Sequence, residues 1–139
     1  MAYIPTHFKD VLGDCVSNNV ETVREFMAAW SALNAEQLVE YFSEDGIYHN
    51  MPAQPVQGHE KLKVFIKGFI GPWTKTTWDI LNIIGDGDLV VVERIDRTEI
   101  GDVKVDLPCC GVFEMRDGKI KVWRDYFDMN TYTKPLSKG

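Results

Sequence analysis

Three charged side chains occupy positions where a strand usually carries apolar residues. In segment 90–99, alternation along a predicted strand puts Arg94 and Asp96 on the same face as two valines. Asp125 lies between two aromatic residues on one face of a later predicted strand. Two carboxyl groups in one pocket can act as general acid and general base. For Arg94 and Asp96 taken alone, however, a structural ion pair is the commoner explanation.

Two uncharged polar residues could belong to the same pocket. Tyr48 and Asn50 share a face of a short predicted strand, and a hydroxyl and an amide can together hold a water molecule. The opposite face of that strand is about as apolar, and the same is true of the strand that carries Asp125. Periodicity therefore leaves open whether these three side chains point inward.

Hydrophobic periodicity predicts the elements that must position these residues. Helices are expected from Asn18 or Asn19 to about Trp30, from Asn34 to Phe42 and from His59 to Phe69. Strands are expected over 47–51, 74–84, 89–100, 103–116 and 119–128. Residues 1–17 are predicted to form an N-terminal arm, irregular or briefly helical, 55–58 a loop and 130–139 a polar tail.

This order predicts an α+β fold, because the helices are segregated from most of the strands. The 139 residues are enough for one domain, 1–139, with its own core. A single long sheet, antiparallel or mixed, must twist strongly. Three to four helices on its concave side would then close a cone around an apolar pocket.

Composition excludes several classes of function. A net charge of -6 without a basic run argues against nucleic acid or an anionic membrane as partner. No apolar run approaches the roughly 20 residues of a membrane span, and no secretory signal is evident, so the cytoplasm is the expected compartment. The cysteines and histidines show no metal-ligand spacing, and phosphate-loop, GxGxxG and GxSxG motifs are missing, so we expect neither metal nor cofactor.

Several short motifs together are more informative than any one of them. They are Glu25-Phe26-Met27, Glu40-Tyr41-Phe42, Tyr48-x-Asn50-Met51-Pro52, Glu93-Arg94-x-Asp96, Gly111-Val112-Phe113, Asp117-Gly118-Lys119-Ile120 and Trp123-Arg124-Asp125-Tyr126-Phe127-Asp128. In type, order and spacing this set resembles the limonene-1,2-epoxide hydrolase family, within the nuclear transport factor 2-like, SnoaL-like superfamily. The resemblance covers about residues 18–130 and implies the same cone-shaped fold.

The resemblance also implies an activity and a role for each polar residue. The activity is cofactor-independent addition of water to a small apolar or cyclic epoxide, giving a vicinal diol. Asp125 corresponds to the base that deprotonates water, and Tyr48 and Asn50 would hold that water. Asp96 corresponds to the acid that protonates the epoxide oxygen, and Arg94 would bridge the two carboxyl groups. A homodimer is implied as well.

Apolar residues are expected to complete the pocket, although ordinary core packing is an alternative for each. The expected lining residues are Met27, Trp30, Trp78, Leu107, Cys109 and Phe127. Two other functions are compatible with this fold: a ketosteroid isomerase-like or polyketide cyclase-like enzyme, and a module that binds a small apolar ligand without catalysis. Neither needs an arginine between two acids together with a pair of water-holding residues.

Overall fold

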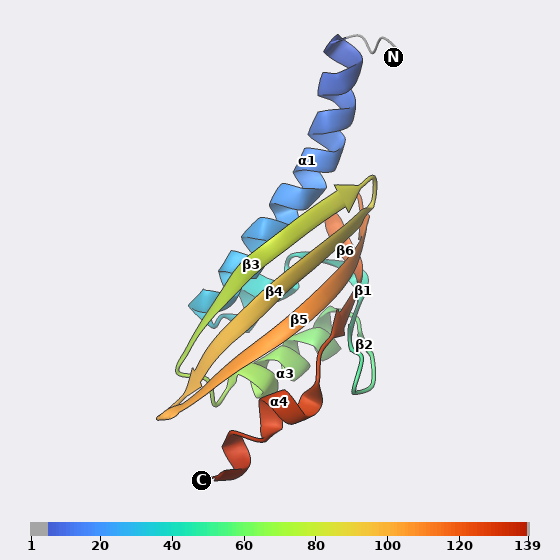
Figure 1. The fold of residues 1–139 in the computed structure, drawn as a ribbon. Helices are drawn as coiled ribbons and strands as arrows, with labels where there is room; N and C mark the ends of the chain where they lie inside the picture. Colours follow the sequence, from blue (N-terminus) through green and yellow to red (C-terminus); the bar gives the residue numbers. More distant parts are fainter. Residues whose placement is uncertain (1–5, 139) are drawn as a thin grey trace.

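The computed structural model describes residues 6–138, and the side chains of 18–137 (Figure 1). Its frame is a six-stranded mixed sheet with the strand order β2-β1-β6-β5-β4-β3. The strands are β1 (Phe42–Asn50), β2 (Val56–Gln57), β3 (Lys75–Asp86), β4 (Leu89–Ile100), β5 (Val103–Arg116) and β6 (Lys119–Tyr126). The helices are α1 (Thr6–Ala29), α2 (Ala35–Val39), α3 (His59–Ile70) and α4 (Met129–Thr133), with short 3-10 turns at Trp30–Ala32 and Leu136–Lys138.

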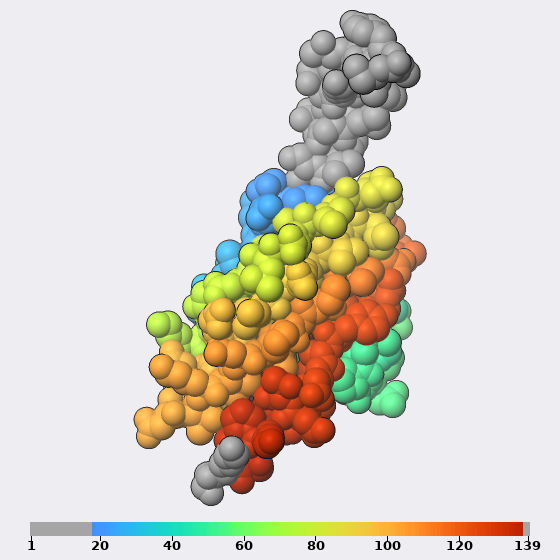
Figure 2. All heavy atoms as spheres, in the orientation of Figure 1, coloured from blue at the N-terminus to red at the C-terminus, as the bar shows by residue number. Residues whose placement is uncertain are grey.

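The predicted α+β class is confirmed. Strands β3 to β6 form an antiparallel meander, and β1 then pairs in parallel with β6, which makes the sheet mixed. Figure 1 shows α1 and α3 behind the curled sheet. On the side seen in Figure 2, the side chains of β3, β4 and β5 form the surface. None of the helices within residues 6–138 has the length and apolar character needed to cross a membrane.

The predicted bounds of two long strands are correct, since β4 and β5 span Leu89–Ile100 and Val103–Arg116. Clear alternation and tight turns at both ends explain this success. At the β5–β6 hairpin, Asp117 and Gly118 both have positive φ, 52° and 76°. Asp-Gly is a preferred pair for such a turn, because glycine adopts positive φ without steric cost.

The N-terminal prediction was wrong about where the first helix begins. We expected Asn18 or Asn19 to cap it, but α1 begins at Thr6. The Asn19 side chain does not cap the helix: its Nδ2 donates to the carbonyl of Gly87, 2.8 Å away in the β3–β4 turn. Of the predicted N-terminal arm, residues 1–5 lie outside the described part of the chain.

The second helix is shorter than predicted. Asn34 does cap α2, accepting from the Gln37 amide, but the helix ends at Val39 and Phe42 already belongs to β1. Phe42 pairs with Ile120 of β6 across a parallel register that shifts before Ile47. The predicted loop at 55–58 likewise contains strand β2, which pairs with β1. The pairing of β1 with β6 joins segments far apart in sequence, so local periodicity could not reveal it.

The predicted polar tail contains helix α4, and β6 ends at Tyr126, earlier than expected. Asp128 caps α4 by accepting from the Asn130 amide at 3.1 Å. The Tyr132 hydroxyl accepts a hydrogen bond from Trp73 Nε1 at 3.0 Å, which ties the tail to the body of the protein. A five-residue helix is too short to be stable alone, so tertiary contacts of this kind hold it.

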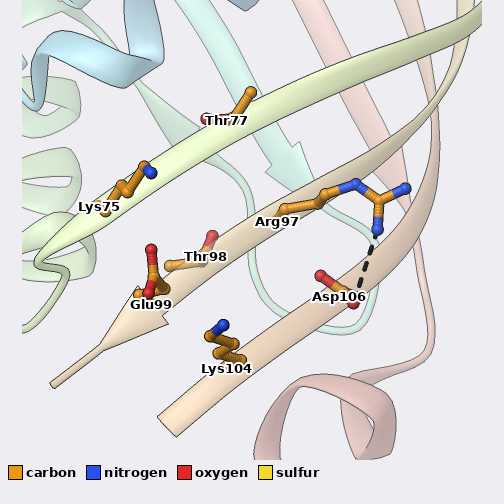
Figure 3. Close-up of a pocket in the computed structure, with 7 residues that line it drawn as sticks. All are labelled: Lys75, Thr77, Arg97, Thr98, Glu99, Lys104 and Asp106. Atoms are coloured by element: carbon orange, nitrogen blue, oxygen red, sulfur yellow. Dashed lines mark ion pairs between the residues drawn. The ribbon is translucent and has the colours of Figure 1, made fainter. Parts of the chain in front are cut away.

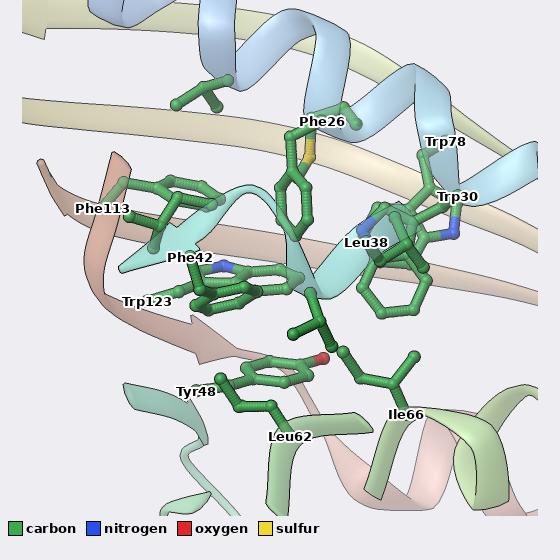
Figure 4. Packing of buried hydrophobic residues seen from close by; sticks show 14 of the residues in the cluster. Phe26, Trp30, Leu38, Phe42, Tyr48, Leu62, Ile66, Trp78, Phe113 and Trp123 are labelled. Atoms are coloured by element: carbon green, nitrogen blue, oxygen red, sulfur yellow. The ribbon is translucent and has the colours of Figure 1, made fainter. Parts of the chain in front are cut away.

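An aromatic core fills the space between the sheet and the helices (Figure 4). The Trp123 ring stacks on Tyr48, with centroids 4.1 Å apart and planes 3° apart, and on Phe113 from the other side at 5.1 Å. Trp30 stacks on Trp78 at 4.3 Å. Because interlocking rings leave side chains little freedom, this core fixes the inner face of the sheet on which the polar residues lie.

Candidate active site

Three strands bring the five predicted polar residues together on the inner face of the sheet. Arg94 and Asp96 come from β4, Asp125 from β6, and Tyr48 and Asn50 from β1. The parallel register of β1 and β6 places Asn50 directly beside Asp125. All five residues are buried, with exposed fractions between 0% for Arg94 and 6% for Asn50 and Asp96. Periodicity did not decide whether Tyr48, Asn50 and Asp125 point inward, and in the structure all three do.

Arg94 connects the two carboxyl groups with four hydrogen bonds. Its Nε and Nη2 donate to the two oxygens of Asp96 at 2.7 and 3.0 Å. Its Nη1 and Nη2 donate to the two oxygens of Asp125 at 2.8 and 2.7 Å. Paired, bidentate contacts of this kind hold planar groups in a defined orientation. The arginine therefore fixes the position of each acid relative to the other.

Aromatic rings hold the guanidinium in place. The Arg94 Cζ lies 4.6 Å from the centroid of Trp78 and 5.6 Å from that of Trp123. A cation over an aromatic face is attracted by the ring, more strongly when water is excluded. Burial alone lowers the pKa of Arg94, but the charges of Asp125 and Asp96 outweigh it and raise that pKa well above its ordinary value. The guanidinium stays charged.

The environment of Asp96 shifts its titration upward, so that the carboxyl group keeps its proton to a higher pH than an ordinary aspartate does. Burial raises the pKa of Asp96 to about 6, although Arg94 acts to lower it, and the nearby charge of Asp125 adds to the increase. Two carboxyl groups that share one arginine in a buried site resist ionising together. Burial, and then the charge of Asp125, also raise the pKa of Tyr48 well above its usual range, so its hydroxyl keeps its proton.

An apolar cavity of ≈ 240 Å³ opens onto four of these residues. Its lining residues are Tyr48, Asn50, Ala53, Phe65, Phe69, Trp78, Asp96, Leu107, Asp125, Phe127, Met129, Tyr132 and Thr133. Arg94 lies behind the two acids, fully buried. The cavity is large enough for a small organic molecule beside a water molecule, and both acids face it.

The structure places three of the six apolar residues predicted to line the pocket on its wall. These are Trp78, Leu107 and Phe127. Met27 and Trp30 lie in the core behind the wall, where Trp30 supports Trp78 from the rear. Cys109 is also absent from the wall, because its side chain turns toward Asp96. Alternation identifies the inward face of an element, but not how deep each side chain lies.

Two elements contribute lining residues that we did not predict. Phe65 and Phe69 project from α3 one turn apart, and Tyr132 comes from α4. Both phenylalanines belong to the apolar side of a helix predicted from sequence, and this spacing was the only available signal. No comparable signal identified Tyr132, because its place depends on the contact with Trp73.

Asp96, Cys109 and Asp125 each present a ligand atom within 4.8 Å of the others, as a metal site would require. A cation already occupies this position, because the Arg94 guanidinium binds all four carboxylate oxygens. Burial also raises the pKa of the Cys109 thiol, and only a thiolate is a good metal ligand. The chemistry of these donors therefore suits the arginine better than a metal ion.

A second hollow lies on the outer face of the sheet (Figure 3). Its lining residues are Lys75, Thr77, Arg97, Thr98, Glu99, Lys104 and Asp106. Arg97 is paired there with Asp79 at 2.6 Å and with Asp106 at 3.5 Å. These side chains are about half exposed, which is the usual state of ion pairs on a solvated sheet face. We therefore place the candidate site in the inner cavity.

Gly111 makes room for the ion-pair network. It lies opposite Asp125 in the β5–β6 register. A Cβ atom at this position would come within 2.8 Å of Trp123 Nε1 and within 3.1 Å of both Arg94 Nη1 and Asp125 Oδ1. These three groups are held by stacking and paired hydrogen bonds, so none of them can move without losing a contact.

We therefore expect Gly111→Ala to lower the free energy of unfolding by about 1–3 kcal/mol, the usual effect of overpacking. Urea denaturation measures this change. The matched control is Gly68→Ala on α3, where an added Cβ meets nothing within 4 Å and the helix should gain slightly. A Gly111→Ala protein as stable as the parent would show that the network is loosely packed.

Fold and site together define the class of protein: a nuclear transport factor 2-like α+β cone with two acids at the wall of an apolar cavity and an arginine behind them. The family model described as the limonene-1,2-epoxide hydrolase catalytic domain matches residues 17–138. The epoxide hydrolase EphG of Mycobacterium tuberculosis is 35% identical over 99 residues, which is 69% of this chain and 64% of that protein. The chain belongs to the limonene-1,2-epoxide hydrolase family.

Solved structures share this fold. The structure of a limonene-1,2-epoxide hydrolase-like epoxide hydrolase from Mycobacterium tuberculosis is 29% identical, with a TM-score of 0.76. The match covers 89% of this chain and 92% of that one. A protein of Catenulispora acidiphila with a ketosteroid isomerase-like fold is 20% identical, with a TM-score of 0.76, covering 84% and 92%. A SnoaL-like protein of Shewanella putrefaciens is 14% identical, with a TM-score of 0.75, covering 87% and 97%. The last two likenesses concern the fold alone.

Proposed function

We propose that the protein is a cofactor-independent epoxide hydrolase that adds water to a small apolar or cyclic epoxide in one step. One observation carries the proposal: Asp96 and Asp125, each bound through two hydrogen bonds to Arg94, both border the apolar cavity. An epoxide needs a proton on its oxygen and a nucleophile at carbon. Two acids in different protonation states can supply these two functions without a covalent intermediate.

In the proposed step, Asp125 removes a proton from a water molecule held by Tyr48 and Asn50. The water oxygen forms a bond to an epoxide carbon while the carbon–oxygen bond of the ring breaks. Asp96 gives its proton to the departing oxygen, so the product is a vicinal diol. Asp125 is then protonated and Asp96 ionised, and exchange of a proton with solvent restores the resting state.

The cavity wall suits this chemistry. Phe65, Phe69 and Phe127 present apolar surface to a substrate in the cavity, and Tyr48, Asn50, Asp96 and Asp125 reach the same cavity from β1, β4 and β6. Low polarity around the acids strengthens each electrostatic contact and favours the neutral form of Asp96. Arg94 stabilises the single negative charge that passes from one carboxyl group to the other.

The pKa of Asp96, raised to about 6 by burial, predicts how activity depends on pH. The acid must be protonated to act, and its protonated fraction falls as pH rises through its pKa. We therefore expect kcat/KM to decline on the alkaline side with a midpoint near pH 6, approaching tenfold per unit. Initial rates between pH 4.5 and 9 measure this profile. A rate that rises steadily to pH 9 would contradict the assignment of Asp96.

The test of the function is incubation of the purified protein with cyclohexene oxide and limonene oxide, followed by chromatography of the diol. Formation of diol above the uncatalysed rate is expected. No turnover across a broad panel of epoxides would overturn the proposal and favour an isomerase, a cyclase or a binding module on the same fold. A binding measurement with a small apolar ligand of similar size should accompany the panel, because it detects a binding module that has no activity.

We also infer that the protein acts as a homodimer in the cytoplasm. Leu81 and Ile84 on the edge strand β3 are 54% and 69% exposed, an apolar pair that a second copy could cover. Cys109 and Cys110 are free thiols, as expected in a reducing compartment. Light scattering after size exclusion distinguishes a dimer from a monomer.

A further inference from the structure

Cys109 contacts the candidate acid but not the cavity. It lies on β5 directly opposite Arg94 in the β4–β5 register, and the residue is 5% exposed. Its Sγ is 3.5 Å from Asp96 Oδ2 and 3.4 Å from the carbonyl oxygen of Leu107. The thiol therefore has two acceptors within reach, and the mechanism above uses neither contact.

A neutral thiol has one proton to donate. Burial raises the pKa of Cys109 above its ordinary range, and the charge of Asp96 adds to this effect, so the S–H bond persists at all physiological pH values. Hydrogen bonds to a charged acceptor are stronger than those to a neutral one. The thiol should therefore favour the Asp96 carboxylate when Asp96 is ionised and the Leu107 carbonyl when Asp96 is protonated.

We propose that Cys109 is a positioning residue that strengthens Asp96 as an acid, by donating a hydrogen bond to the carboxylate that remains once the proton has left. The part of this proposal that concerns catalysis rests on the proposed epoxide hydrolysis. The contact itself does not, because the thiol and the carboxyl group meet in the resting protein.

Other groups that face Asp96 bear on the same equilibrium. Arg94 approaches from the same strand, Asp125 from β6 and Tyr48 from β1, and Tyr132 of α4 borders the same cavity. Burial is the largest influence and raises the pKa of Asp96, whereas the bonds from Arg94 and from Cys109 lower it. Without the thiol, the bonds from Arg94 remain to lower the pKa of Asp96, whereas burial and the charge of Asp125 still raise it.

The proposal predicts a measurable shift in the titration of Asp96. Cys109→Ala should raise the pKa of Asp96 by about 0.5–1 unit. This shift is smaller than the loss of a typical hydrogen bond to a charged group would cause, because a thiol is a weak donor. Cys109→Ser, which keeps a donor of similar size, should restore the parent value or lower it. Cys110→Ala is the matched control, because Cys110 lies opposite Glu93, one position away from the Arg94 pair.

Carbon-13 resonances of labelled aspartate carboxyl groups, followed from pH 4 to 9 and assigned with Asp96→Asn, measure this titration without turnover. An unchanged or lowered pKa in Cys109→Ala would overturn the proposal. So would a Cys109→Ser protein that titrates like Cys109→Ala, because packing rather than a donor would then explain the shift. If the shift occurs but no epoxide is hydrolysed, the positioning contact stands and the proposed function fails.

Discussion

Asp125→Asn is expected to lower kcat/KM for an epoxide by about 10²–10⁴-fold, because an amide cannot take a proton from water and general base catalysis typically contributes that much. The amide can still accept one bond from Arg94, so the backbone and the cavity should change little. Hydrolysis of cyclohexene oxide, followed by gas chromatography, gives the rate. Circular dichroism verifies that the variant is folded.

Asp96→Asn should cause a loss of similar size through the other proton transfer, because an amide does not protonate the departing oxygen. Asp106→Asn on β5 is the matched control: its side chain is 63% exposed and its partner is the surface residue Arg97. It should keep the parent rate. Full activity in Asp125→Asn would refute the assignment of that residue as the base.

Arg94→Met is expected to have the largest effect on stability. Removing the cation leaves Asp96 and Asp125 buried without their four hydrogen bonds. Breaking a buried ion pair by removing one partner costs about 3–5 kcal/mol. Without the cation, Asp96 will bind its proton more tightly in the folded protein than in the unfolded chain. Urea denaturation gives the free energy of unfolding.

The stability of Arg94→Met should also depend on pH in a defined direction. A carboxyl group with a raised folded pKa contributes stability that is fully present below its unfolded pKa and is lost as pH rises through the folded pKa. The variant should therefore be less destabilised at pH 5 than at pH 8. Arg97→Met, on the exposed face of the same strand, should change stability by about 1 kcal/mol or less at both pH values. Equal destabilisation of Arg94→Met at pH 5 and pH 8 would contradict the buried network.

The inward face of β4 was predicted correctly from the sequence, because Arg94 and Asp96 share a face of the strand with two valines, and valines are usually buried. The sequence did not decide the faces of Asp125, Tyr48 and Asn50. That decision comes from the parallel pairing of β1 with β6, which joins residues more than seventy positions apart. No local period contains this information, and the resemblance to a family supplied it instead.

Depth in the core was the other quantity that could not be predicted. Met27 and Phe65 both lie on the apolar sides of their helices, yet only Phe65 reaches the cavity. The difference depends on how closely each helix approaches the sheet, and therefore on the volumes of all the side chains between them. Tyr132 illustrates the same limit, since its helix forms where the C-terminal segment meets Trp73.

A single turnover in water enriched in oxygen-18 tests the proposed one-step mechanism most directly. Enzyme in molar excess over cyclohexene oxide is mixed in labelled water, and the diol and the intact protein are analysed by mass spectrometry. If Asp125 acts as a base, the first diol formed carries one labelled oxygen and the protein carries none. An unlabelled diol from the first turnover would mean that a carboxylate oxygen of the enzyme attacked the epoxide, and would contradict the proposed mechanism.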